Sequence, residues 1–199
     1  MRLFLFLILL FSIAFAVTNK KLVVIGDSLT EGLGVSKESA YPALVEKKIH
    51  DSGKKNWTVI NAGVSGSTTA SVVGRMKWLF KSKPDLILLV MGANDGLRGL
   101  KIEESEKNLS EAIEYTQSQK VPLVLGGIYI PPNYGKDYTE KFKKMYLTLA
   151  KKYKIPLIPF VLDKVGGDPR YNQADGIHPN EAGHKIIAET VYQQIKGLL

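Results

Sequence analysis

Cysteine is absent from this chain of 199 residues. The absence excludes disulfide bonds, a thiolate nucleophile and cysteine-based zinc sites. It does not argue against export, because a domain of this size can be stabilised by burial of a hydrophobic core alone. Hydrophobic residues make up 45% of the chain and charged residues 23%, which is typical of a soluble globular protein.

Several motifs that would define other kinds of site are also missing. The chain contains neither a phosphate-binding loop nor a His-Glu-x-x-His pair. Gly26, Gly32 and Gly34 lack the spacing of a dinucleotide fingerprint. No metal or organic cofactor is therefore implied. Repeats, low-complexity segments and linkers are absent too, so we expect a single domain.

Acidic residues are outnumbered: 27 Lys and Arg against 19 Asp and Glu give a formal net charge of +8. The lysines are spread along predicted helices, and no compact basic stripe is interleaved with aromatic residues, so nucleic-acid binding is not expected. A solvated basic surface is the favoured interpretation. Such a surface would attract anionic membranes or acidic substrates weakly and transiently.

The one long hydrophobic run lies at the N-terminus. An arginine at position 2 precedes a 15-residue apolar run that contains one serine, and Ala14 and Ala16 provide small residues near its end. This is the order of a secretory signal. The alternative is an uncleaved anchor, but a spanning helix needs ~20 residues. We predict a signal peptide at residues 1–16, cleaved near Ala16-Val17, and a periplasmic or secreted domain at residues 17–199.

Apolar runs and amphipathic helical patterns alternate along the rest of the chain. This alternation predicts a parallel sheet with helices on both faces and right-handed crossovers. The predicted strands are residues 22–25, 57–60, 86–91, 123–128 and 157–160. The predicted helices are residues 40–51, 70–81, 102–119, 136–153 and 180–196.

Polar residues that could carry chemistry fall near one edge of this predicted sheet. Ser28, Gly66 and Asn94 follow the first, second and third strands, and Asp175 and His178 precede the last helix. In such sheets ligands bind outside the carboxyl ends of the strands. The topology therefore predicts a site at this edge.

A serine hydroxyl is a poor nucleophile until a base takes its proton. Ser28 is the candidate nucleophile, although no Gly-x-Ser-x-Gly elbow surrounds it. His178 is the candidate base because it lies in a turn before the last helix. His50 lies at a charged helix end and His184 lies inside the last helix, so both fit structural roles better.

Asp175 precedes His178 by three residues, so its carboxylate can reach back across a tight turn to the imidazole. Such a bond fixes the tautomer and stabilises the imidazolium that forms during catalysis. Asp163 and Asp168 compete for this role from farther away in the sequence.

Acyl transfer also requires hydrogen-bond donors aimed at the developing oxyanion. The candidates are the backbone N–H of Ser28, the N–H of Gly66, which no side chain obstructs, and the neutral side-chain amide of Asn94. Taken singly, Gly66 and Asn94 would be ordinary turn and loop residues. Together with the serine, histidine and aspartate they indicate a serine hydrolase.

Four sequence blocks occur in the order found in a known family: Gly26-Asp27-Ser28-Leu29, Asn61-Ala62-Gly63-Val64-Ser65-Gly66, Gly92-Ala93-Asn94-Asp95 and Asp175-Gly176-Ile177-His178-Pro179. With them the chain resembles the SGNH, or GDSL-type, hydrolases over essentially all residues after position 16. It looks most like their bacterial acyl-CoA thioesterase I, arylesterase and lysophospholipase group. The resemblance implies a flavodoxin-like α/β/α sandwich around five parallel strands.

The same resemblance implies the roles of the site residues. Ser28 would be the nucleophile, His178 the base and Asp175 its orienter. The oxyanion donors would be Ser28, Asn94 and Gly66, the last in preference to Gly63. The sequence departs from the family at Ser67, where many members have Asp, and at Ala93, which replaces a common glycine.

The activity implied is hydrolysis of acyl esters and thioesters, including lysophospholipids, by an exported monomer that acts on small-molecule substrates. Apolar residues at the same edge are expected to line an acyl groove: Val64, Leu97, Ile130 and Ile177, with Ile128 assigned equally to groove or core. Two alternatives use the same fold, namely a carbohydrate O-acetylesterase and a non-catalytic protein that binds lipid or glycan.

Overall fold

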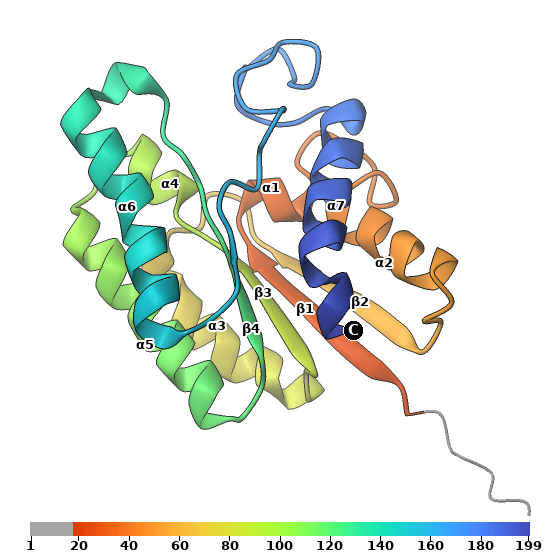
Figure 1. The fold of residues 1–199 in the computed structure, drawn as a ribbon. Coiled ribbons are helices and arrows are strands. Elements are labelled where there is room, and N and C mark those ends of the chain that lie inside the picture. Colours follow the sequence, from red (N-terminus) through yellow and green to blue (C-terminus); the bar gives the residue numbers. More distant parts are fainter. Residues whose placement is uncertain (1–17) are drawn as a thin grey trace, which may run out of the picture.

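The computed structural model describes residues 18–199, so the predicted signal peptide lies outside the described residues. Five parallel strands form one sheet in the order β2-β1-β3-β4-β5 (Figure 1). This is a common strand order of doubly wound sheets, and it confirms the predicted α/β fold. The strands are β1 (Lys20–Gly26), β2 (Trp57–Gly63), β3 (Leu86–Val90), β4 (Leu123–Gly126) and β5 (Leu157–Ile158).

Helices cover both faces of the sheet and complete the three layers (Figure 1). Two helices pack together on one face, and three lie on the other. The first pair is α2 (Tyr41–Asp51) and α7 (Glu181–Ile195). The second group is α3 (Val72–Leu79), α5 (Ile102–Ser118) and α6 (Lys136–Tyr153).

The long helices are amphipathic, and their apolar sides face the sheet. In α6, Phe142, Met145, Tyr146 and Leu149 recur at intervals of three and four residues and are buried. Every residue of β3 is buried, as expected for a central parallel strand that is covered on both faces.

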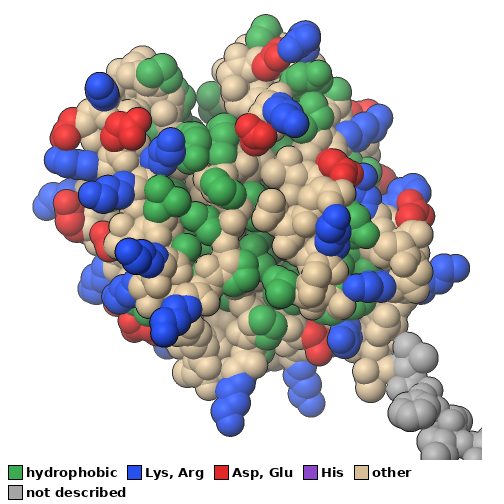
Figure 2. Space-filling view, viewed as in Figure 1, with side chains coloured by type: hydrophobic (Ala, Val, Ile, Leu, Met, Phe, Trp, Pro, Cys, Tyr) green, Lys and Arg blue, Asp and Glu red, His purple; other side chains and the backbone are tan. Residues whose placement is uncertain are grey.

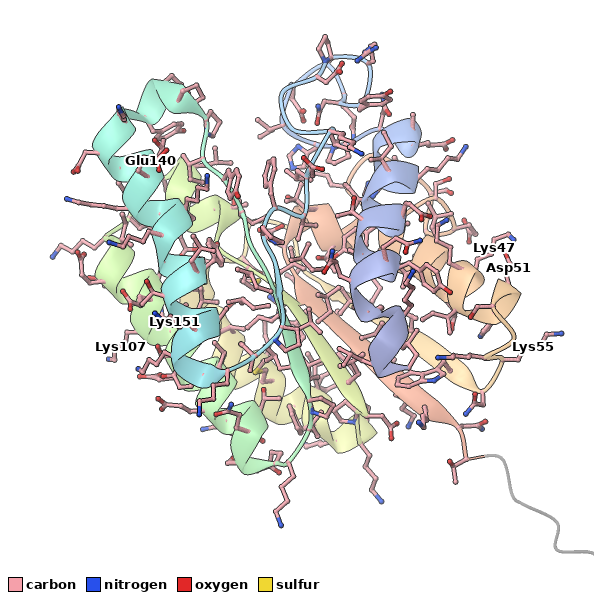
Figure 3. The ribbon with its side chains drawn as sticks, viewed as in Figure 1. Lys47, Asp51, Lys55, Lys107, Glu140 and Lys151 are labelled. Carbon is pink, nitrogen blue, oxygen red and sulfur yellow. The ribbon has the colours of Figure 1, made fainter. Side chains whose placement is uncertain are left out.

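Charged side chains occupy the outer sides of the same helices. Figure 3 shows Lys47 and Asp51 of α2 and Lys107 of α5 on surfaces that face away from the sheet. Lys47 and Asp51 form an exposed ion pair of 2.7 Å. Lys and Arg side chains are scattered over the face shown in Figure 2 and do not gather into one stripe. The basic residues on this face therefore form a solvated surface.

The structure differs from the predicted elements at strand ends and in short helices. The strand predicted at residues 157–160 shortens to β5, because Pro159 has no N–H to continue the ladder. The helix predicted at residues 70–81 is α3 flanked by two 3₁₀ turns, η1 (Thr69–Ser71) and η2 (Phe80–Ser82). The sequence reading missed α1 (Ser28–Glu31) and α4 (Ala93–Leu97), because four or five residues show too little periodicity.

Within residues 18–199, none of the helices combines the length and the hydrophobicity that a membrane crossing requires.

Candidate active site

One cavity of about 430 Å³ lies at the carboxyl edge of the sheet. Figure 1 shows α1, α4, the chain that leaves β4 and the connection that enters α7 together at this end. In Figure 2 a hollow between the two upper lobes carries hydrophobic side chains on its walls. The cavity is lined by Ser28, Leu29, Ala93, Asn94, Leu97, residues 128–132, Phe160, Leu162, Gly166, Gly167 and residues 176–178.

Ser28, His178 and Asp175 form a hydrogen-bonded chain at this cavity. His178 Nε2 lies 2.9 Å from Ser28 Oγ, and His178 Nδ1 lies 2.7 Å from Asp175 Oδ2. The other carboxylate oxygen of Asp175 accepts hydrogen bonds from the backbone N–H groups of Ile177 and His178, each at 3.0 Å. These three side chains therefore lie in the geometry of a nucleophile, a base and an orienter.

The bonds to Asp175 keep its carboxyl ionised. Its pKa is lowered from 3.8 to about 2, chiefly by the backbone N–H and the side chain of His178. An ionised carboxylate only accepts hydrogen bonds, so it favours a proton on His178 Nδ1. His178 Nε2 is then the nitrogen that can accept the Ser28 proton.

The Ser28 turn is built by the residues just before it. A Cβ on Gly26 would lie 1.9 Å from Thr30 Oγ1, so the turn into α1 requires glycine there. Asp27 caps α1, and its Oδ1 accepts a hydrogen bond of 3.0 Å from the Leu29 N–H. Burial raises the pKa of Asp27 from 3.8 to about 6.

The three predicted oxyanion donors differ in their surroundings. Ser28 and Asn94 line the cavity. Asn94 Nδ2 donates to the Ser67 carbonyl at 3.0 Å, and a primary amide carries a second N–H that can serve a ligand. Gly66 is not among the lining residues; it lies in the exposed loop after β2, where its carbonyl accepts a 3.0 Å bond from Arg98.

Sequence reasoning missed the role of Asp95, which is buried beside this site. Its carboxylate accepts bonds from the Thr69 N–H at 2.9 Å, the Thr69 hydroxyl at 2.6 Å and the Ser105 hydroxyl at 3.1 Å. Asp95 therefore ties the segment after β2 to α4 and α5. The available signal was an acidic residue in the block that also holds Asn94.

The predicted acyl-groove residues divide into two groups. Leu97, Ile130 and Ile177 line the cavity, and so does Ile128. Val64 does not line it, because it lies on the loop after β2 with 50% of its surface exposed.

A second part of the cavity wall was not predicted from the sequence. Tyr129 and Phe160 stack with their ring centroids 4.2 Å apart, and both line the cavity with Gly166 and Gly167. The sequence predicts Phe160 at the end of a strand, and the loop that holds the two glycines has no periodic pattern. These contacts could not be found without the fold.

Other aspartate and histidine candidates for the roles of orienter and base have partners elsewhere in the structure. Asp168 pairs with Arg170 at 2.6 Å. His184 is buried in α7, where its Nδ1 accepts a 3.2 Å bond from the Tyr41 N–H. Burial lowers the pKa of His184 to about 4, so it is neutral at physiological pH. His50 Nε2 lies 2.7 Å from the Trp57 carbonyl.

The described part of the chain holds no cluster of three or more histidine, cysteine, aspartate or glutamate side chains placed to bind a metal ion.

Comparison with known proteins places this arrangement in context. Residues 24–186 match the model of the GDSL-like lipase/acylhydrolase family. Esterase TesA of Pseudomonas aeruginosa is 38% identical over 89% of this chain and 89% of its own length. Thioesterase 1/protease 1/lysophospholipase L1 of Escherichia coli K12 is 36% identical over 98% of this chain and 92% of its own. A crystal structure of TesA superposes with a TM-score of 0.87 at 37% identity, covering 90% of this chain and all of the other.

Proposed function

The chain belongs to the GDSL-like lipase/acylhydrolase family of SGNH hydrolases and is an enzyme of the esterase and thioesterase type; we propose that it works through an acyl-enzyme on Ser28. The observation that carries this proposal is the 2.9 Å contact between Ser28 Oγ and His178 Nε2 at the wall of the cavity. An orienting carboxylate on the other imidazole nitrogen supports the same assignment.

In the proposed reaction, Ser28 Oγ attacks the acyl carbonyl carbon while His178 Nε2 takes the hydroxyl proton. The ionised Asp175 stabilises the imidazolium that results. The tetrahedral intermediate collapses when His178 gives the proton to the leaving alcohol or thiol. A water molecule then attacks the acyl-enzyme, with His178 again as the base, and releases the carboxylic acid and free Ser28.

The oxyanion of both tetrahedral intermediates would be held by N–H donors. The candidates are the backbone N–H groups of Ser28 and Gly66 and the side-chain amide of Asn94. The bond from Asn94 to the Ser67 carbonyl fixes the amide before substrate arrives, and a donor that is already oriented needs no reorganisation during the reaction. Losing one such donor costs on the order of a hundredfold in rate.

The cavity supports the proposed substrate class. Its volume of about 430 Å³ lies within the usual range of small-molecule sites, and most of its lining side chains are apolar. An acyl chain would fill such a space, with Leu97, Ile128 and Ile130 as contacts. The names of the relatives, which include esterase, thioesterase and lysophospholipase, support acyl substrates. We therefore propose acyl esters, acyl thioesters and lysophospholipids as substrates of a monomeric enzyme.

We further propose that residues 1–16 are a signal peptide and that the mature enzyme acts in the periplasm or outside the cell. The order of basic residue, apolar run and small-residue exit supports this.

The test compares the wild-type protein with Ser28→Ala, His178→Ala and the surface control Ser36→Ala on a short p-nitrophenyl ester. The two site variants should lose turnover and keep the wild-type circular dichroism spectrum, and the control should remain active. Turnover by Ser28→Ala would reject the nucleophile.

A substrate panel then separates the acyl class from its alternatives. Acyl-CoA, lysophospholipid and acetyl-xylan are offered side by side. Turnover of acetyl-xylan alone would favour a carbohydrate O-acetylesterase. Failure of a fluorophosphonate to label Ser28, with no turnover in the panel, would favour a binding protein.

A further inference from the structure

Asp27 holds a polar atom that the structure leaves unpaired. Among residues 18–199, Asp27 Oδ2 is the one buried side-chain nitrogen or oxygen with no hydrogen-bond partner. The residue is 1% exposed and immediately precedes Ser28. Burying a carboxylate oxygen without a hydrogen-bond partner is costly, and the position of this one beside the nucleophile indicates a use for its charge.

The other oxygen of Asp27 shapes the nucleophile turn. Asp27 Oδ1 accepts from the Leu29 N–H at 3.0 Å, and the Asp27 carbonyl accepts from the Glu31 N–H at 2.9 Å. Arg75 of α3 donates to the Gly26 carbonyl at 2.9 Å and so holds the residue before Asp27. The backbone on either side of Ser28 is thereby fixed.

The buried carboxylate interacts electrostatically with titratable and charged groups from several elements: Arg75 of α3, Tyr41 of α2, Asp95 of α4, Tyr146 of α6 and His178 in the turn before α7. Burial holds the pKa values of both tyrosines above their ordinary value, so they stay neutral. Arg75 is bonded to backbone carbonyls, and Asp95 to Thr69 and Ser105. His178 is therefore the neighbour whose charge changes during the proposed reaction.

We propose that Asp27 is a positioning residue of the proposed reaction: Oδ1 fixes the Ser28 turn, and the negative charge of the buried carboxylate stabilises the imidazolium on His178. The proposal rests on the acyl-enzyme mechanism proposed above. A charge on Asp175 is partly screened by water, because 46% of that side chain is exposed. Asp27 is shielded from solvent, so its charge acts over a longer distance.

The two roles of Asp27 can be separated by substitution. Asp27→Asn keeps a side-chain oxygen that can cap α1 but removes the negative charge. Asp27→Ser provides a second uncharged cap. Asp85→Asn is the matched control, because Asp85 also accepts a backbone bond, from the Lys21 N–H at 2.8 Å, but at the start of β3. Ser28→Ala is the reference for the proposed function.

The experiment measures kcat and KM of the purified protein on a short p-nitrophenyl ester across the acid range. Burial raises the pKa of Asp27 to about 6, so the acid limb of wild-type activity should contain two ionisations. In Asp27→Asn we expect kcat to fall about tenfold with KM unchanged, and the acid limb to lose the ionisation that Asp27 contributes. Asp85→Asn should keep the wild-type profile.

A folded Asp27→Asn with the wild-type kcat, midpoint and slope would overturn the proposal. If circular dichroism shows that neither Asp27→Asn nor Asp27→Ser folds, the acid limb of the wild-type pH–activity profile decides. A wild-type limb that a single ionisation describes would contradict the proposal. The two proposals fail separately. Turnover by Ser28→Ala rejects the mechanism, whereas an inactive Ser28→Ala beside an unaltered Asp27→Asn rejects only the role of Asp27.

Discussion

The two ring nitrogens of His178 have different partners, and this difference gives the imidazole its direction. Nδ1 faces Asp175 at 2.7 Å and Nε2 faces Ser28 at 2.9 Å. Because Asp175 only accepts, the Nδ1–H tautomer is favoured and Nε2 is left as the acceptor. The chemistry proposed here depends on that tautomer.

Replacing Asp175 with Asn should therefore reverse the polarity of the imidazole. The new amide can donate to Nδ1, which places the proton on Nε2 and removes the base. We expect kcat to fall on the order of 10³–10⁴-fold while the protein stays folded. Steady-state kinetics of Asp175→Asn beside Asp168→Asn, which loses only an exposed pair with Arg170, would check this. Equal losses in the two variants would contradict the assignment.

Asp27 should leave a signature in stability as well as in rate. Its pKa is raised from 3.8 to about 6, so the folded protein holds a proton that the unfolded chain has released between these values. Its contribution to stability is fully present below about pH 4 and is lost as pH rises through about 6, on the order of 3 kcal/mol in total.

Asp27→Asn has no such titration. Urea unfolding at several pH values should show a smaller loss of unfolding free energy across this window in Asp27→Asn than in wild type. Asp85→Asn should follow the wild-type curve. Parallel curves for wild type and Asp27→Asn would mean that the carboxyl is not desolvated in the folded protein.

At the scale of elements, one part of the cavity wall is formed where two connections meet. The chain after β4 contributes Tyr129, and the long connection from β5 to α7 contributes Phe160, which stacks on it. Lys143 of α6 lies 4.8 Å from the Tyr129 ring centre and supports the stack from outside. The stack therefore bounds the space where we propose that an acyl chain binds.

Shortening one member of the stack should change substrate choice. We expect Phe160→Ala to raise kcat/KM for long-chain p-nitrophenyl esters relative to acetate and butyrate by about tenfold, because the cavity widens where the ring was. Phe80→Ala is the control, because Phe80 packs edge-on against Tyr115 of α5, with ring centroids 5.2 Å apart, and does not line the cavity. A chain-length profile identical to wild type in Phe160→Ala would show that the stack does not bound the acyl site.

These elements also show what the sequence could and could not predict. Strong periodicity located α6 at its observed bounds and β1 and β3 within two residues at each end. The position of Ser28, Asn94 and His178 near one edge followed from parallel topology alone. The short helices α1 and α4 and the Tyr129–Phe160 stack did not follow, because they arise from capping and from contacts between distant segments.

At the scale of the whole molecule, the chain combines a basic surface with a predicted export signal. We expect the protein, when expressed with its own N-terminus in a bacterial host, to be recovered from the periplasm or the medium with a mass that begins at Val17. Ala16→Phe should block cleavage, because a large residue replaces the small one before the cut, whereas Ala14→Ser should be processed. Intact mass spectrometry of each fraction checks this, and a wild-type protein that retains Met1 would contradict it.

A second question about the whole molecule is whether one nucleophile accounts for all of the ester hydrolysis. The most direct measurement is intact-mass and peptide analysis of the purified protein after treatment with a fluorophosphonate. We expect one adduct, on the peptide that contains Ser28, complete loss of ester turnover, and no adduct in Ser28→Ala. We also expect greatly slowed labelling in His178→Ala. Full inactivation with the label on any other residue, or fast labelling without His178, would contradict it.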